Sequence, residues 1–101
     1  MSYKYIIDSS AWVEYFGGTE LGNTIKTIIE QEQIATSVIA ITELADKFAR
    51  ESKAFDTSIH FIQRRATILP ITVPLSLKAA LLKNEIRSKH PKFGIVDAIH
   101  L

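Results

Sequence analysis

Short apolar runs rich in β-branched residues alternate along this chain with longer segments whose apolar positions recur every three or four residues. The short runs predict strands at residues 3–7, 33–36 and 66–73. The helical spacing predicts helices over about 11–16, 19–32, 37–52, 55–65 and 74–89, and a last one from about 95 to 101. Strands that alternate with amphipathic helices indicate βαβ units, so we expect an α/β fold with a parallel sheet.

Capping and turn residues predict several of the boundaries. Gly17-Gly18 is expected to end the first helix, and Ser37 is expected to cap the helix that follows the second strand. Pro70, inside the third strand, favours an edge position because proline has no N–H for a sheet hydrogen bond. The sequence stops at Leu101 inside an apolar pattern without a C-cap. We therefore expect residues 1–101 to be a single domain that lacks its last strand or strands.

Composition narrows the class of protein. The 101 residues include 12 Lys and Arg against 11 Asp and Glu, and 47% are hydrophobic, which is typical of one globular domain. The absence of cysteine excludes disulfides, thiolate zinc sites and cysteine nucleophiles. No apolar run approaches the roughly 20 residues of a membrane span, and Asp8 interrupts the first run too early for a signal peptide. We expect a cytoplasmic protein whose nucleic-acid binding, if any, rests on local patches.

Three acidic residues occupy positions where chemistry is expected. Asp8 follows the first strand, and Glu43 lies in the first half of the helix after the second strand. Each has an ordinary alternative, a helix cap for Asp8 and a solvated helix edge for Glu43. Asp97 is flanked on both sides by apolar residues, in a predicted helix that is apolar nearly all round. A buried ionised carboxylate there requires a charged partner or a metal ion.

The three acids together suggest more than each does alone, because all are expected near one edge of the sheet. Two carboxylates about 5 Å apart repel each other by roughly 3 kcal/mol at an effective dielectric constant near 20. Proteins assemble such clusters mostly around a divalent cation. With no cysteine and no well-spaced histidine pair, Mg²⁺ or Mn²⁺ is favoured over zinc. The matching chemistry is phosphodiester hydrolysis or phosphoryl transfer.

Three segments resemble, in order and spacing, the motifs of PIN-domain nucleases, and most closely those of VapC-type toxins of prokaryotic toxin–antitoxin pairs. They are YIIDSSAWVEYF at 5–16, ATSVIAITELA at 35–45 and IVDAIHL at 95–101. The resemblance implies a Rossmann-like, three-layer α/β fold and a Mg²⁺- or Mn²⁺-dependent endoribonuclease. It makes Asp8, Glu43 and Asp97 the catalytic and metal-binding acids, with Ser10 orienting a water or ligand beside them. It also implies an antitoxin partner and a homodimer. The family pattern continues into a further acidic motif that residues 1–101 do not contain.

A basic cluster precedes the third motif and is a candidate for contacts with RNA phosphates. Its members are Lys83, Arg87, Lys89 and Lys92. The alternative is an ordinary solvated helix face. Arg64 and Arg65 could serve the same purpose, with less reason. The aromatic residues that follow Asp8 are expected to pack in the core or at a dimer surface rather than to stack on bases; they are Trp12, Tyr15 and Phe16.

Other functions remain open at this point. One is a PIN nuclease of RNA processing or DNA repair without an antitoxin, and another is an inactive remnant that only binds a partner. A receiver-like signalling domain is a third possibility, but it would place an acidic pair after the first strand and an Asp at the end of the third. Here Asp8 stands alone and the third strand candidate ends without an acid, which disfavours that class.

Overall fold

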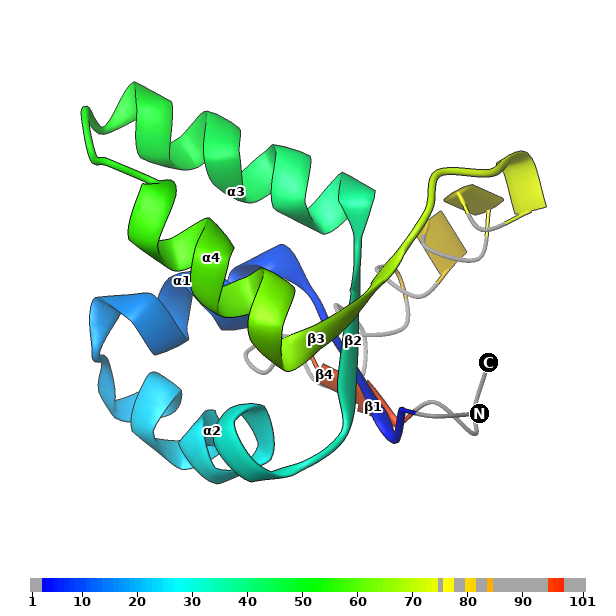
Figure 1. The fold of residues 1–101 in the computed structure, drawn as a ribbon, viewed down its shortest axis with the longest axis horizontal. Helices are drawn as coiled ribbons and strands as arrows, with labels where there is room; N and C mark the ends of the chain where they lie inside the picture. Colours follow the sequence, from blue (N-terminus) through cyan, green and yellow to red (C-terminus); the bar gives the residue numbers. More distant parts are fainter. Residues whose placement is uncertain (1–2, 75, 78–79, 82–83, 85–94, 98–101) are drawn as a thin grey trace.

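The computed structural model describes residues 3–74, 76–77, 80–81, 84 and 95–97 (Figure 1). The strands are β1 (Tyr5–Ile7), β2 (Ile34–Ser37), β3 (Ala66–Leu69) and β4 (Ile95–Asp97). The helices are α1 (Ser9–Gly17), α2 (Glu20–Gln31), α3 (Val38–Arg50) and α4 (Asp56–Arg65). The predicted alternation of strands and helices is therefore confirmed over most of the chain.

The strands form one sheet in the order β3-β2-β1-β4. β1 pairs with β2, and β2 with β3, in parallel, which confirms the expected parallel α/β sheet. Each parallel connection is made by two helices, and α1 to α4 all lie on the same side of the strands (Figure 1). Because β1 and β2 run in the same direction, the beginnings of α1 and α3 meet at the carboxyl edge of the sheet.

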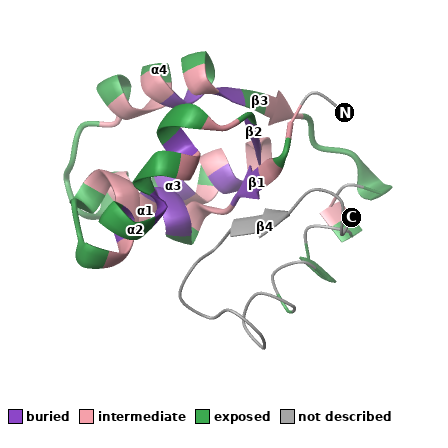
Figure 2. Cartoon of the chain, turned by 90° about the horizontal axis from the view of Figure 1, so that it is seen from below, coloured by how far each residue is buried: buried purple, intermediate pink, exposed green. Residues whose placement is uncertain are grey.

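The core lies between the sheet and these helices. Alternation along the strands points Ile7, Ile34 and Ala66 toward the helices, where they form one buried cluster with side chains of all four. The helical members of this cluster are Ala11, Trp12, Ile25, Ile29, Leu44 and Ile62. Ile6 and Ala35 face the other side of the sheet, with Tyr3 and Leu69 packed beside them. The buried residues therefore concentrate where the strands meet the helices (Figure 2).

The helix boundaries follow the capping residues. Ser37 is the N-cap of α3, as predicted, and its Oγ accepts a hydrogen bond from the Ala40 N–H at 3.0 Å. Gly18 ends α1 in the left-handed conformation, with φ 64°, which a glycine adopts without strain. β3 lies at a sheet edge, as Pro70 suggested, but it ends at Leu69 rather than extending to residue 73. Proline cannot donate the next sheet hydrogen bond, so the strand stops before it.

The prediction of a helix beginning near Ile95 is wrong, because Ile95–Asp97 form the strand β4. β4 runs antiparallel to β1, with Ile95 opposite Ile7 and Asp97 opposite Tyr5. The β-branched Ile95 and Val96 suit a strand, and the edge of β1 offers backbone groups that need partners. Residues 98–101 and most of the predicted helix at 74–89 lie outside the described residues, although 76–77 and 80–81 are helical.

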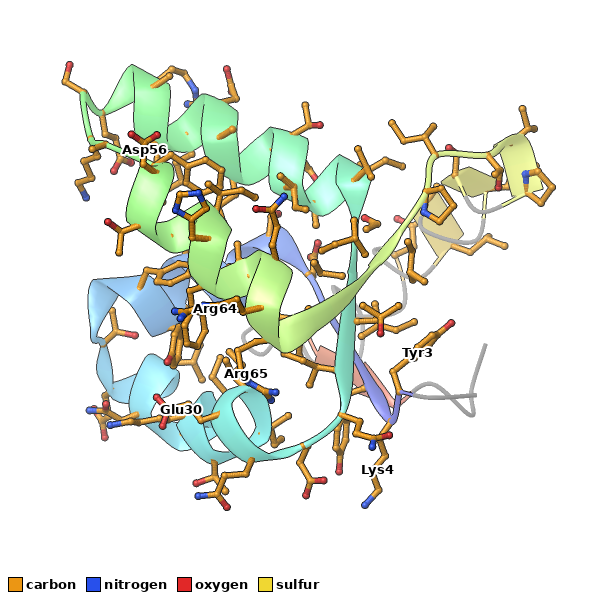
Figure 3. All side chains as sticks on the ribbon, in the orientation of Figure 1. Tyr3, Lys4, Glu30, Asp56, Arg64 and Arg65 are labelled. Atoms are coloured by element: carbon orange, nitrogen blue, oxygen red, sulfur yellow. The ribbon has the colours of Figure 1, made fainter. Side chains whose placement is uncertain are left out.

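A single arginine closes the end of α2. Arg65, the last residue of α4, donates through Nε and Nη2 to the Ile29 carbonyl oxygen, and through Nη2 to that of Glu32. These carbonyls belong to the last turn of the helix, where intrahelical donors run out. Figure 3 shows the Arg65 side chain directed toward α2. Arg65 therefore stabilises the end of α2.

None of the helices in the described part of the chain is long and apolar enough to cross a membrane.

Candidate functional site

Asp8 links the end of β1 to the beginning of α1. It is the N-cap of α1, and its Oδ1 accepts a hydrogen bond from the Ser9 N–H at 2.7 Å. Its Oδ2 lies 3.4 Å from the Ser10 hydroxyl, which donates to it. An ionised carboxylate has about four acceptor positions, so capping leaves lone pairs for a further ligand. Asp8 can therefore cap α1 and still bind a ligand in a functional site.

A buried hydrogen-bond relay holds the start of α1 against the sheet. Trp12 Nε1 donates to Thr36 Oγ1 at 3.0 Å, and this hydroxyl donates in turn to the Ile7 carbonyl oxygen at 2.7 Å. Trp12 and Thr36 are both fully buried. The relay joins α1, β2 and β1 next to Asp8, so it fixes the position of that carboxylate. In the sequence, Thr36 is a single polar residue at the end of an apolar strand, and this pattern does not predict its hydrogen bonds to Trp12 and Ile7.

The aromatic residues of α1 pack in the core, as expected. Trp12 stacks on Phe16 with ring centroids 5.7 Å apart, and Tyr15 stacks on Phe61 at 5.6 Å. The Tyr15 hydroxyl donates to Glu30 Oε2 at 2.6 Å. Burial, and then the hydrogen bond to the Glu30 carboxylate, raise the pKa of Tyr15 to about 12. Trp12, Tyr15 and Phe16 therefore pack α1 against the core and against Phe61 of α4, and are not free to stack on bases.

A hollow of about 330 Å³ lies between α1 and α3, and Ser9, the residue that follows Asp8, is part of its lining. It is lined by residues from the first two turns of α1 and from one face of α3. They are Ser9, Ser10, Val13 and Glu14 on α1, and Glu43, Leu44, Lys47 and Arg50 on α3. We refer to it as the α1–α3 hollow. Two of the residues singled out from the sequence, Ser10 and Glu43, therefore line one hollow, and Asp8 is the N-cap of the helix that carries Ser10.

The charged residues that α3 contributes to the α1–α3 hollow change from acidic to basic along the helix. Glu43, Lys47 and Arg50 are spaced by four and three residues, so they share one face of α3. Lys47 Nζ lies 2.7 Å from Glu51 Oε2, and Arg50 Nε lies 2.9 Å from Asp46 Oδ2. Hydrogen bonds from Lys47, then Lys53, lower the pKa of Glu51 to about 2. The sequence did not identify Lys47 and Arg50 as candidate site residues, because each has an acidic partner four residues away that accounts for it.

Asp97 is placed differently from the other two acids. Because β4 is antiparallel to β1, its carboxyl end lies beside the amino end of β1, and Asp97 pairs with Tyr5. Asp8 lies three residues further along, at the opposite end of that strand, which is about 10 Å at a rise of roughly 3.3 Å per residue. The backbone of Asp97 therefore does not lie at the edge where β1 ends, whereas Asp8 and Glu43 belong to helices that both begin at that edge, so their convergence stays a prediction.

The remaining candidates are not brought to this site by the described residues. Lys83, Arg87, Lys89 and Lys92 lie outside the described part of the chain. Arg64 is exposed on α4 (Figure 3). It lines a separate hollow with Thr57, His60 and Gln63. Over the described residues, no group of three His, Cys, Asp or Glu side chains is arranged to hold a metal ion.

Comparison with known proteins adds one finding. The family model of the PIN domain matches residues 5–101, which is nearly the whole chain. Among curated proteins, none matches this sequence.

Proposed function

The chain belongs to the PIN domain family, a family of nucleases, and from this premise we propose that it is a metal-dependent endoribonuclease. The observation that supports the proposal is the α1–α3 hollow, which is lined by Ser10 and Glu43 and begins at Ser9, the residue that follows Asp8. The helices α1 and α3 both begin at the carboxyl edge of the sheet, where parallel α/β sheets position functional groups. The match covers the segments that contain all three candidate acids.

The donor set near the hollow fits a hard cation. Asp8 and Glu43 offer carboxylate oxygens, and the chain has no cysteine, so Mg²⁺ or Mn²⁺ suits it better than a thiophilic metal. When bound, such an ion polarises phosphate oxygens and activates water. In this proposal Asp8 and Glu43 hold the ion and Ser10 orients the Asp8 carboxylate through its hydroxyl. Asp97 is the third acid, and its position beside Tyr5 makes it the residue that most needs a direct test.

The first experiment measures cleavage of a labelled RNA by the purified chain with Mg²⁺, with Mn²⁺ and with EDTA. We expect cleavage only with metal. Glu43→Gln keeps the length and shape of the side chain but removes its charge, so it should reduce the rate at least a hundredfold while the chain remains folded by circular dichroism. Asp46→Asn, one helical turn further along α3 and outside the hollow, should stay within about twofold of the wild type. Equal activity of Glu43→Gln and wild type would remove the hollow from the mechanism.

Asp97→Asn decides the role of the third acid. If Asp97 helps to hold the ion, the variant should lose cleavage and lose any stabilisation by added Mn²⁺ in thermal unfolding. Its metal-free melting temperature should equal or exceed that of the wild type, because one source of repulsion between carboxylates is gone. Full metal-dependent cleavage by this variant would restrict the site to Asp8 and Glu43.

We further propose that the protein is a VapC-like toxin with an antitoxin partner and that it forms a homodimer. The support is the order and spacing of the three motifs at residues 5–16, 35–45 and 95–101. Induced expression in a bacterial host should arrest growth for the wild type and not for Glu43→Gln. Light scattering after size exclusion should give a dimer mass. Metal-dependent cleavage without growth arrest would instead favour a PIN nuclease that acts without an antitoxin.

A further inference from the structure

The α1–α3 hollow contains two cations that neither the family match nor the acidic site accounts for. Lys47 and Arg50 line its walls one and two helical turns beyond Glu43. Glu43 and Arg50 are seven residues apart, which is about 10 Å along the axis of α3 at 1.5 Å per residue. The α3 wall of the hollow therefore changes from a carboxylate to two cations along one helix face.

We propose that Lys47 and Arg50 bind the backbone phosphates of a single-stranded RNA that lies along the α1–α3 hollow, adjacent to the phosphate that is cleaved. This inference rests on the proposed nuclease function and assigns the path of its substrate. A nucleic-acid strand in duplex geometry has one phosphate per roughly 3.4 Å. Because consecutive phosphates are further apart along a strand than this axial rise, a span of about 10 Å accommodates the cleaved phosphate and one or two neighbours.

The local ion pairs of these residues do not prevent such binding. The Lys47 and Arg50 pairs with Glu51 and Asp46 are exposed i,i+4 pairs, a class that contributes little to stability. The bond to Asp46 uses only Nε of Arg50, and a guanidinium has five N–H donors. Glu51 also pairs with Lys53, whose Nζ lies 3.0 Å from Oε1. Lys47 can therefore turn toward a phosphate while Glu51 keeps a cationic partner.

The polarity of the hollow favours RNA over an acidic peptide. An acidic peptide would meet Glu43 on α3 and Glu14 on α1, and both would repel its carboxylates. An RNA strand along α3 would place one phosphodiester near Glu43, which would help to hold a divalent ion, and a neighbouring phosphate near Lys47 and Arg50. The two cations would then position the strand through its backbone.

The test measures binding of a fluorescein-labelled, single-stranded RNA 12-mer by anisotropy in EDTA, so that no cleavage occurs. The Lys47→Gln/Arg50→Gln double variant should bind at least tenfold more weakly than the wild type at low salt. Its plot of log affinity against log salt should lose about 1.4 from the slope, at roughly 0.7 per phosphate contact on a single strand. Lys53→Gln is the matched control, because it removes a cation from the same Glu51 without touching the hollow, and it should bind as the wild type does.

Cleavage kinetics separate this inference from the proposed function. With Mn²⁺, the double variant should show a KM raised at least fivefold and a kcat within about twofold of the wild type. A wild type that cleaves while the double variant matches Lys53→Gln in binding and KM would overturn this inference alone. A wild type that binds RNA through Lys47 and Arg50 but never cleaves would overturn the nuclease proposal alone. Tighter binding of poly-glutamate than of RNA would assign the hollow to an acidic peptide and overturn the inference.

Discussion

Replacing Thr36 by valine should destabilise the protein by about 2 kcal/mol, because it breaks the relay that holds α1 to the sheet. Thr36 Oγ1 accepts from Trp12 Nε1 and donates to the Ile7 carbonyl oxygen, and its side chain is fully buried. Valine keeps the branched shape but removes both hydrogen bonds. The indole N–H then loses its acceptor in a site that excludes water, at about 2 kcal/mol.

The remaining contributions are smaller and partly offset one another. The Ile7 carbonyl oxygen loses one of its donors, which costs about 1 kcal/mol. The buried methyl group that replaces the hydroxyl returns about 0.8 kcal/mol of transfer free energy. The sum remains near 2 kcal/mol, a large share of the roughly 5–15 kcal/mol that stabilises a domain of this size.

Urea unfolding followed by far-ultraviolet circular dichroism and by the fluorescence of the single tryptophan measures this loss. With an m-value near 2 kcal/mol/M, the midpoint should fall by about 1 M. Thr42→Val is the matched control, since the Thr42 hydroxyl donates to the Val38 carbonyl oxygen of its own helix and is exposed. That variant should change stability by less than about 0.5 kcal/mol.

A double-mutant cycle with Trp12→Phe isolates the relay from the packing of the indole ring. Because both substitutions remove the same hydrogen bond, their effects should be non-additive by about 1 kcal/mol. Equal destabilisation by Thr36→Val and Thr42→Val, or additive effects in the cycle, would refute the reasoning and leave Asp8 without this support.

Three further predictions follow from the packing around α1 and α2. Gly22→Ala should lower the free energy of unfolding in urea by about 1–3 kcal/mol, because the new Cβ would lie 2.1 Å from the Glu14 carbonyl oxygen. Gly17→Ala is the control: its Cβ would make only ordinary contacts, so stability should be unchanged or raised. Arg65→Met should cost about 2 kcal/mol through the lost bonds to two carbonyls that end α2; an unchanged midpoint would contradict that role. Burial and the hydrogen bond to Glu30 raise the pKa of Tyr15 from 10.0 to about 12, so an ultraviolet absorbance titration should show a tyrosine ionising near pH 12. Because the unfolded chain releases that proton first, the contribution of Tyr15 to stability is complete below pH 10 and is lost between pH 10 and 12.

The order of strands and helices could be predicted because each segment has a clear period and its own capping residues. Ser37 both ends β2 and caps α3, and Pro70 both ends β3 and places it at an edge. The placement of residues 95–97 could not be predicted in this way. A short apolar run fits a buried helix and a strand equally well by periodicity. Its state is decided by the edge of β1, more than 85 residues earlier in the chain, which offers antiparallel partners.

Of the candidate site, only the residues that follow the ends of strands could be predicted from the sequence. Asp8 and Glu43 follow parallel strands, so the topology alone brings their helices to one edge. Lys47 and Arg50 form i,i+4 ion pairs with Glu51, the C-cap of α3, and with Asp46. From the sequence, these pairs are reason enough for the two cations; only the packing of α1 against the same face of α3 shows that they also line a hollow. Lys47 and Arg50 line the same hollow as Ser10 because α1 packs against α3, and the residue spacing within α3 cannot predict that packing. For the same reason the cations of the hollow, and not its acids, are the part of the site that required the three-dimensional structure to find.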